Sequence, residues 1–79
     1  MRDRIRELMA DVFQLSAAEV PPDASNQTLP GWDSLRHMEL MLAVELEFGV
    51  QISSEAMPTL LSLEEIELYL REQGVATAA

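Results

Sequence analysis

Several residue types that build common functional sites are absent from this 79-residue chain, or nearly so. It has no cysteine, which excludes disulfide bridges and thiolate metal ligands. It has no lysine, so a lipoyl or biotinyl arm attached through a lysine amide is excluded as well. A single histidine, with neither a paired acidic ligand loop nor a glycine-rich phosphate loop, leaves metal and nucleotide sites without support. A hydrophobic core must therefore stabilise the fold.

Basic residues are scarce, and those present are all arginine. Five arginines stand against 14 aspartates and glutamates, which gives a formal net charge of −9. This balance excludes nucleic acid as a partner, because the phosphate backbone repels such a surface. An acidic surface is suited to meeting basic patches on other proteins, or it serves solubility alone, and charge does not decide between the two.

Long apolar runs are missing too. No stretch approaches the roughly 20 apolar residues that span a bilayer, and no basic start precedes an apolar core as in a secretion signal. We therefore expect a cytoplasmic protein that does not enter the membrane. A chain of this length predicts one small domain, monomeric and too small for a large enclosed active site.

Apolar periodicity predicts an all-α fold. A first helix is expected over 2–15, because apolar residues recur there with the spacing of one helix face. These residues are Ile5, Leu8, Met9, Val12 and Phe13. Prolines and small polar residues over 21–32 predict a long first loop. A second helix should begin at Asp33 or Ser34, with Asp33 as its cap, and should end at Phe48 because Gly49 stops it.

The C-terminal third predicts a further long helix. A short helix around 54–60 is weakened by Pro58. Ser62 and Glu65 have capping-box spacing and open a last helix that stops at Gly74. The predicted fold is a small antiparallel bundle of three to four helices with a long first loop. Its single domain covers 1–74, and residues 75–79 form a flexible C-terminal tail.

The second predicted helix is apolar on two sides, which one helix in so small a bundle can rarely bury. One stripe consists of Leu40, Met41, Val44 and Phe48. The other consists of Leu35, Met38, Leu42 and Leu46. Either neighbouring elements surround this helix, or one stripe packs inward while the other meets a partner, as exposed apolar patches rimmed by charge do. The stripe that begins beside Ser34 is the candidate for exposure.

Ser34 lies where the second predicted helix begins. Unpaired amides and the helix macrodipole favour an anion at this end, so a phosphate ester on the serine hydroxyl would be well placed. The residues alone also allow a plainer role, in which Ser34 is a second capping serine.

The sequence Asp33-Ser34-Leu35, followed by a helix that ends with ELEFG over 45–49, resembles the acyl carrier protein family. The resemblance covers nearly the whole chain, from the first helix through the long loop to the last helix. It implies that Ser34 carries a 4′-phosphopantetheine arm, transferred from coenzyme A by a separate phosphopantetheinyl transferase. It also implies that the thiol of the arm holds an acyl group as a thioester, and that the chain itself is not an enzyme.

The same resemblance implies partner-docking residues along the second helix. These are Asp33, Leu35, Met38, Glu39, Leu42 and Glu45. The implied partners are the transferase, acyl-activating or acyl-transferring enzymes, and downstream biosynthetic enzymes. Three positions depart from the family pattern, since Leu46 replaces a usual acidic residue, Arg36 adds a positive charge near Ser34, and Pro58 lies in the short third element. The Trp32-Asp33 pair and the absence of fused domains favour a dedicated polyketide, aminoacyl or small-acid pathway over bulk fatty-acid synthesis.

Two alternatives stay open on the residues alone. Ser34 and His37, one helical turn apart, would suit a small serine hydrolase, but no glycine follows the serine as it does in a nucleophile elbow. An unmodified acidic adaptor would bind a partner through Leu35, Met38 and Leu42, and would not need the Ser34 hydroxyl.

Overall fold

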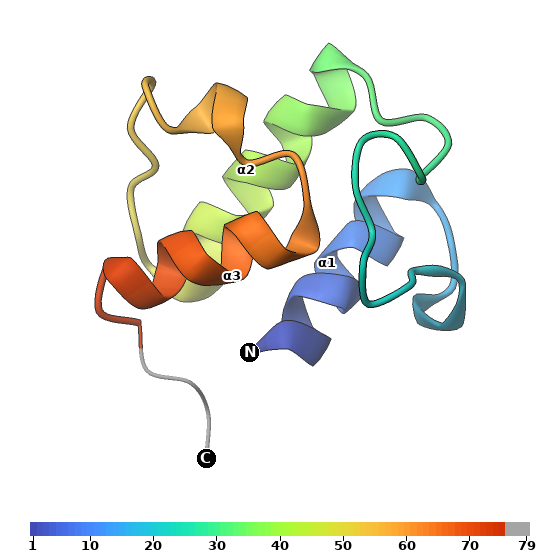
Figure 1. The fold of residues 1–79 in the computed structure, drawn as a ribbon, viewed down its shortest axis with the longest axis horizontal. Coiled ribbons are helices and arrows are strands. Elements are labelled where there is room, and N and C mark those ends of the chain that lie inside the picture. The colour runs from blue at the N-terminus through green and yellow to red at the C-terminus, as the bar shows by residue number, and fades with distance from the viewer. Residues whose placement is uncertain (76–79) are drawn as a thin grey trace.

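The computed structural model describes residues 1–75, which form three α-helices and two short 3₁₀ turns (Figure 1). In chain order these are α1 (Arg2–Phe13), η1 (Ala17–Glu19), α2 (Ser34–Phe48), η2 (Met57–Thr59) and α3 (Leu63–Glu72). No strand forms within these residues, and one isolated antiparallel bridge joins Ser25 to Ser62. The all-α class predicted from the sequence is confirmed.

The first predicted helix is present as α1, but it ends at Phe13 instead of continuing to Leu15. Gln14 adopts the left-handed conformation with φ 58°, and its N–H donates to the carbonyl of Ala10. This conformation stops the helix before the prolines do, so the end of α1 is set by its own last turn. Most of the predicted apolar face is buried, and Val12 lies at its edge.

The segment 20–33, which joins η1 to α2, contains no helix and is held by both side chains and backbone. Its buried apolar residues are Val20, Ala24 and Leu29. The N–H of Asn26 donates to the carbonyl of Leu61 at 2.9 Å, and the N–H of Leu63 donates to the carbonyl of Ala24 at 2.9 Å. These bonds tie the segment to the start of α3, so the chain reaches α2 along a defined path.

The short helix predicted around 54–60 shrinks to η2, a single turn with Pro58 at its second residue. α3 begins after Ser62, whose Oγ accepts the N–H of Glu65 at 3.1 Å, as the capping-box spacing predicts. The inward apolar residues of α3 are Leu63, Ile66 and Leu70.

α3 also buries a charged residue, which the apolar pattern does not predict. Glu67 is only 7% exposed, and its Oε1 accepts the Nη2–H of Arg2 at 2.7 Å. This hydrogen bond lowers the pKa of the Glu67 carboxyl, although burial opposes the effect. Arg71 lies 3.7 Å from the other carboxylate oxygen. The start of α1 and the middle of α3 are therefore joined by an ion pair as well as by apolar packing.

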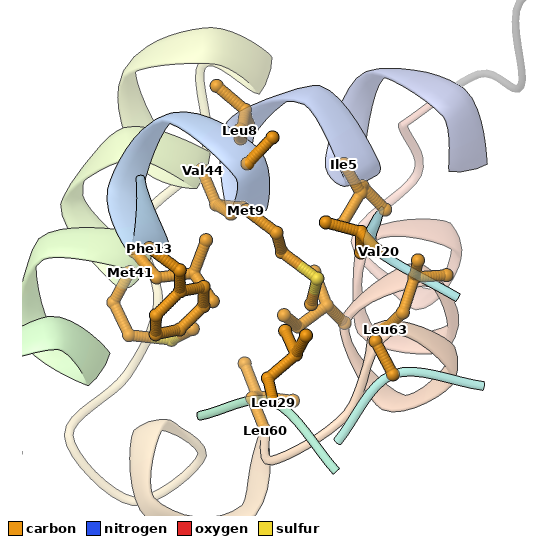
Figure 2. Packing of buried hydrophobic residues seen from close by; sticks show 14 of the residues in the cluster. Ile5, Leu8, Met9, Phe13, Val20, Leu29, Met41, Val44, Leu60 and Leu63 are labelled. Carbon is orange, nitrogen blue, oxygen red and sulfur yellow. The ribbon is translucent and has the colours of Figure 1, made fainter. Parts of the chain in front are cut away.

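The core lies where α1, α2, α3 and the segment 20–33 meet. Figure 2 shows side chains from all four, among them Met9, Met41, Leu29 and Leu63, converging in one cluster. Because Leu40, Met41 and Val44 of α2 are buried in this core, it fixes which face of that helix points outward.

The end of the described chain stays close to the helices. The N–H of Val75 donates to the carbonyl of Leu70 at 3.0 Å, and its side chain packs partly against the core. The other residues of the predicted tail, 76–79, lie outside the described part. No helix within residues 1–75 has the length and apolar character that a membrane crossing requires.

Candidate functional site

Ser34 is the first residue of α2, and the turn before it is built by local bonds. Gly31 has φ 85°, a left-handed conformation that favours glycine, and its carbonyl accepts the N–H of Asp33 at 2.9 Å. Asp33 is the N-cap, and its Oδ1 accepts the N–H of Arg36 at 2.8 Å. The cap predicted from the sequence is confirmed. Because Asp33 does the capping, the exposed Ser34 hydroxyl is not needed for it.

A pocket of about 270 Å³ opens beside Ser34. Its lining consists of Asn26, Trp32, Asp33, Ser34, His37 and Leu61. The Trp32 ring forms one side of the pocket and packs against Phe13 of α1, with ring centroids 5.1 Å apart. α1 therefore supports this side of the pocket. The pocket combines one aromatic and one aliphatic surface with several polar groups, and it adjoins the serine hydroxyl.

Both ring nitrogens of His37 are engaged away from Ser34. Nδ1 accepts the indole N–H of Trp32 at 3.1 Å, and Nε2 lies 2.7 Å from the carbonyl oxygen of Met57. A serine hydrolase needs an imidazole nitrogen that is free to take the proton of the nucleophile. The arrangement therefore speaks against a Ser34–His37 catalytic pair.

The two apolar stripes of α2 face opposite environments. Leu40, Met41 and Val44 are fully buried, and Phe48 is half-buried at the end of the stripe. The exposed stripe consists of Leu35 (69% exposed), Met38 (47%), Leu42 (55%) and Leu46 (86%). The reading in which neighbours surround α2 is wrong, and the exposure predicted for the stripe beside Ser34 is confirmed. Exposed apolar patches of this kind are typical of interaction surfaces.

The acidic residues of α2 are not equivalent. Glu39 is exposed and lies 3.8 Å from the guanidinium of Arg36. Glu45 is half-buried, and its Oε2 accepts the N–H of Ile52 at 2.8 Å. Glu47 accepts from Arg4 at 2.8 Å, and this hydrogen bond lowers the pKa of the Glu47 carboxyl. Of the two predicted docking glutamates, Glu39 is the more accessible.

Arg36, one of the departures from the family pattern, acts within the fold. Its Nη1–H donates to the carbonyl of Val12 at 3.0 Å, in the last turn of α1. A cation near the C-terminus of a helix also interacts favourably with its dipole. Arg36 therefore joins the end of α1 to the start of α2, close to Ser34.

Sequence reasoning missed the tertiary links of His37, Arg36 and Glu45. Their partners lie 20, 24 and 7 residues away, in loops or at the end of another helix. Helix periodicity reports which face of a helix is apolar, but it does not report which loop carbonyl or amide approaches that face. The one feature of the sequence that could have indicated these hydrogen bonds is the presence of polar side chains beside the buried stripe of α2.

Comparison with known proteins identifies the class of this domain. The family model described as "Phosphopantetheine attachment site" matches residues 3–70, which include the whole of α2 and its exposed serine. The chain belongs to this family, as an acyl carrier protein domain. It functions as an acyl carrier, and membership implies a covalently attached 4′-phosphopantetheine.

Individual relatives are similar over most of their length. The chain is 45% identical over 53 residues to an acyl carrier protein of Solidesulfovibrio magneticus, covering 67% of this chain and 68% of that one. It is 32% identical over 73 residues to an acyl carrier protein of Nitratidesulfovibrio vulgaris, covering 92% and 96%. It is also 35% identical over 63 residues to "Polyketide-8 synthase acyl carrier protein 2" of Streptomyces avermitilis, covering 80% and 72%.

Proposed function

We propose that Ser34 is the residue to which 4′-phosphopantetheine is attached. The observation that carries the proposal is the exposed position of Ser34 as the first residue of α2, beside the pocket. The unpaired amides and the dipole of this helix start favour the phosphodiester that attachment leaves there. Because both nitrogens of His37 are engaged, the base for the transfer comes from a separate phosphopantetheinyl transferase.

The transfer is a substitution at phosphorus. The Oγ of Ser34 attacks the coenzyme A phosphorus that bears the pantetheine. A new O–P bond forms while the bond from that phosphorus to the adenosine bisphosphate leaving group breaks. The serine proton passes to the base of the transferase. Once attached, the arm supplies a thiol that holds the acyl group as a thioester, and the chain itself supplies position and recognition without catalysis.

Partner enzymes dock, in this proposal, on the outer face of α2. The docking residues are Asp33, Leu35, Met38, Glu39, Leu42 and Glu45. Exposed apolar side chains beside Ser34 supply contact area, and carboxylates supply orientation toward basic patches. For Glu45 this role is added to its internal bond with Ile52, since the carboxylate is half-buried.

We further infer the surroundings in which the carrier works. The three helices and the segment 20–33 form a small antiparallel bundle with a long first loop, as a monomeric carrier domain in the cytoplasm. Its partners are acyl-activating or acyl-transferring enzymes and downstream biosynthetic enzymes. The polyketide carrier of Streptomyces avermitilis among the relatives favours a dedicated pathway of polyketide, aminoacyl or small-acid type.

The test is intact mass after incubation with coenzyme A and a broad-specificity phosphopantetheinyl transferase. Wild-type protein should gain one phosphopantetheine group, and Ser34→Ala should gain none. Ser62→Ala is the matched control, because Ser62 also stands at the start of a helix but should leave the gain unchanged. A folded wild-type protein that gains no mass would instead favour the unmodified acidic adaptor, which binds its partner equally well after Ser34→Ala.

A further inference from the structure

His37 connects three parts of the chain around Ser34. Its Nδ1 accepts the indole N–H of Trp32, and its Nε2 approaches the carbonyl of Met57 in η2. An indole nitrogen only donates and a carbonyl oxygen only accepts, so these partners place the imidazole proton on Nε2 and leave the ring neutral. His37 thereby joins α2 both to the residue before the Asp33 cap and to η2.

Trp32 carries this connection to the start of α2. Its ring stacks with the His37 ring, with centroids 6.1 Å apart and planes at 25°, and it packs against Phe13 on another side. It directly precedes Asp33, and together with His37 it lines the pocket beside Ser34. Neither ring can turn without breaking their shared hydrogen bond, so the pocket wall and the helix start are held in one arrangement.

We propose that His37 is a positioning residue for the transfer of phosphopantetheine to Ser34, acting through Trp32 and Met57. The proposal rests on the proposed function of Ser34. His37 touches no reacting atom, but its two hydrogen bonds hold the turn before Ser34 and η2 in the conformation that the transferase meets. A nucleophile misplaced by about 1 Å can lose about 100-fold in rate, so release of this link should slow transfer while the helices stay intact.

Two variants separate the hydrogen bonds from the bulk of the ring. His37→Gln offers an amide that accepts from Trp32 and donates to Met57 without titrating, whereas His37→Phe keeps a flat ring and does neither. We expect kcat/KM for transfer, followed by intact mass, to fall about tenfold or more in His37→Phe and to stay within about threefold of wild type in His37→Gln. Ile66→Val, a mild core truncation outside the pocket, is the stability control and should stay within about threefold as well.

Trp32→Phe removes the indole donor and provides a second test if His37→Phe folds poorly. It should slow transfer as His37→Phe does. Equal slowing in His37→Gln and His37→Phe would overturn the positioning role. So would a rate in Ile66→Val as low as that in His37→Phe. Wild-type protein that gains no mass overturns the proposed function of Ser34, and the role of His37 falls with it.

Discussion

The Asp33 carboxylate caps α2 and also lies beside Ser34, where we propose that it meets partner enzymes. Two substitutions can separate the cap from this docking role. Removing an N-cap hydrogen bond, here the 2.8 Å bond from the N–H of Arg36, costs about 1 kcal/mol of the free energy of unfolding. In a domain of this size, about 1 kcal/mol lowers the melting temperature by about 4–8 °C. We expect this loss in Asp33→Ala. Asp33→Asn keeps an oxygen acceptor and should lose at most about 0.3 kcal/mol.

The same two variants test docking, since both lack the negative charge. Melting is followed by far-ultraviolet circular dichroism, and phosphopantetheine transfer is timed well below both melting temperatures. If the charge of Asp33 meets basic groups of the transferase, both variants slow transfer to a similar extent, and the deficit shrinks at high salt. Equal melting temperatures for Asp33→Ala and Asp33→Asn would refute the capping argument. A wild-type transfer rate in Asp33→Asn would refute the docking role and show that Asp33 acts only as the cap of α2.

Other side chains give shorter tests. Glu39→Lys should slow transfer without changing the helical signal, because Glu39 has only a loose 3.8 Å contact with Arg36. Glu45→Lys should slow transfer and also lower the free energy of unfolding by about 1–2 kcal/mol, because the N–H of buried Ile52 loses its acceptor. Glu45→Gln keeps an acceptor oxygen and should therefore keep most of the wild-type stability. The pKa of Glu67 in the folded chain lies below its ordinary value of 4.5, so the stability it contributes is present above that value and is lost as pH falls through the folded pKa. Glu67→Gln should melt below wild type at neutral pH, and thermal melts of the two should converge in acid once the pH falls below the folded pKa of Glu67.

Much of the fold could be predicted because its signals are local. The cap at Asp33, the stop at Gly49 and the cap at Ser62 each act within a single turn of chain, and all three are present. Of the capping box predicted at Ser62, the bond from the N–H of Glu65 to the Ser62 Oγ forms, and the Glu65 carboxylate accepts from the Ser62 hydroxyl. The exposed stripe of α2 could be predicted as well, because a helix with two apolar sides exceeds what a small bundle can cover.

The features that could not be predicted depend on contacts between segments that are distant in the sequence. Gln14 ends α1 in a left-handed conformation, which the presence of a glutamine does not predict. Glu67 is buried because it pairs with Arg2, 65 residues away in the sequence. The pocket beside Ser34 requires Asn26 and Leu61 to arrive from segments whose paths are set by backbone bonds between loops. Periodicity carries no information about such bonds.

The net charge of −9 overstates the acidity that a partner meets on α2. Toward the end of the helix, Glu45 is bonded to a backbone amide and Glu47 to Arg4, while Leu46 is 86% exposed beside them. Near Ser34 the exposed carboxylates are those of Asp33 and Glu39. Arg36 lies 3.8 Å from Glu39 and offsets part of its charge, so Asp33 is the carboxylate of this end with no cation paired to it among the ion pairs of residues 1–75. Charge acts over about 8 Å at physiological salt, so we expect a basic patch to meet the Ser34 end and apolar side chains to meet Leu46. In the docking proposed above, Asp33 and Glu39 therefore supply the charge that orients the basic groups of a partner over the Ser34 hydroxyl.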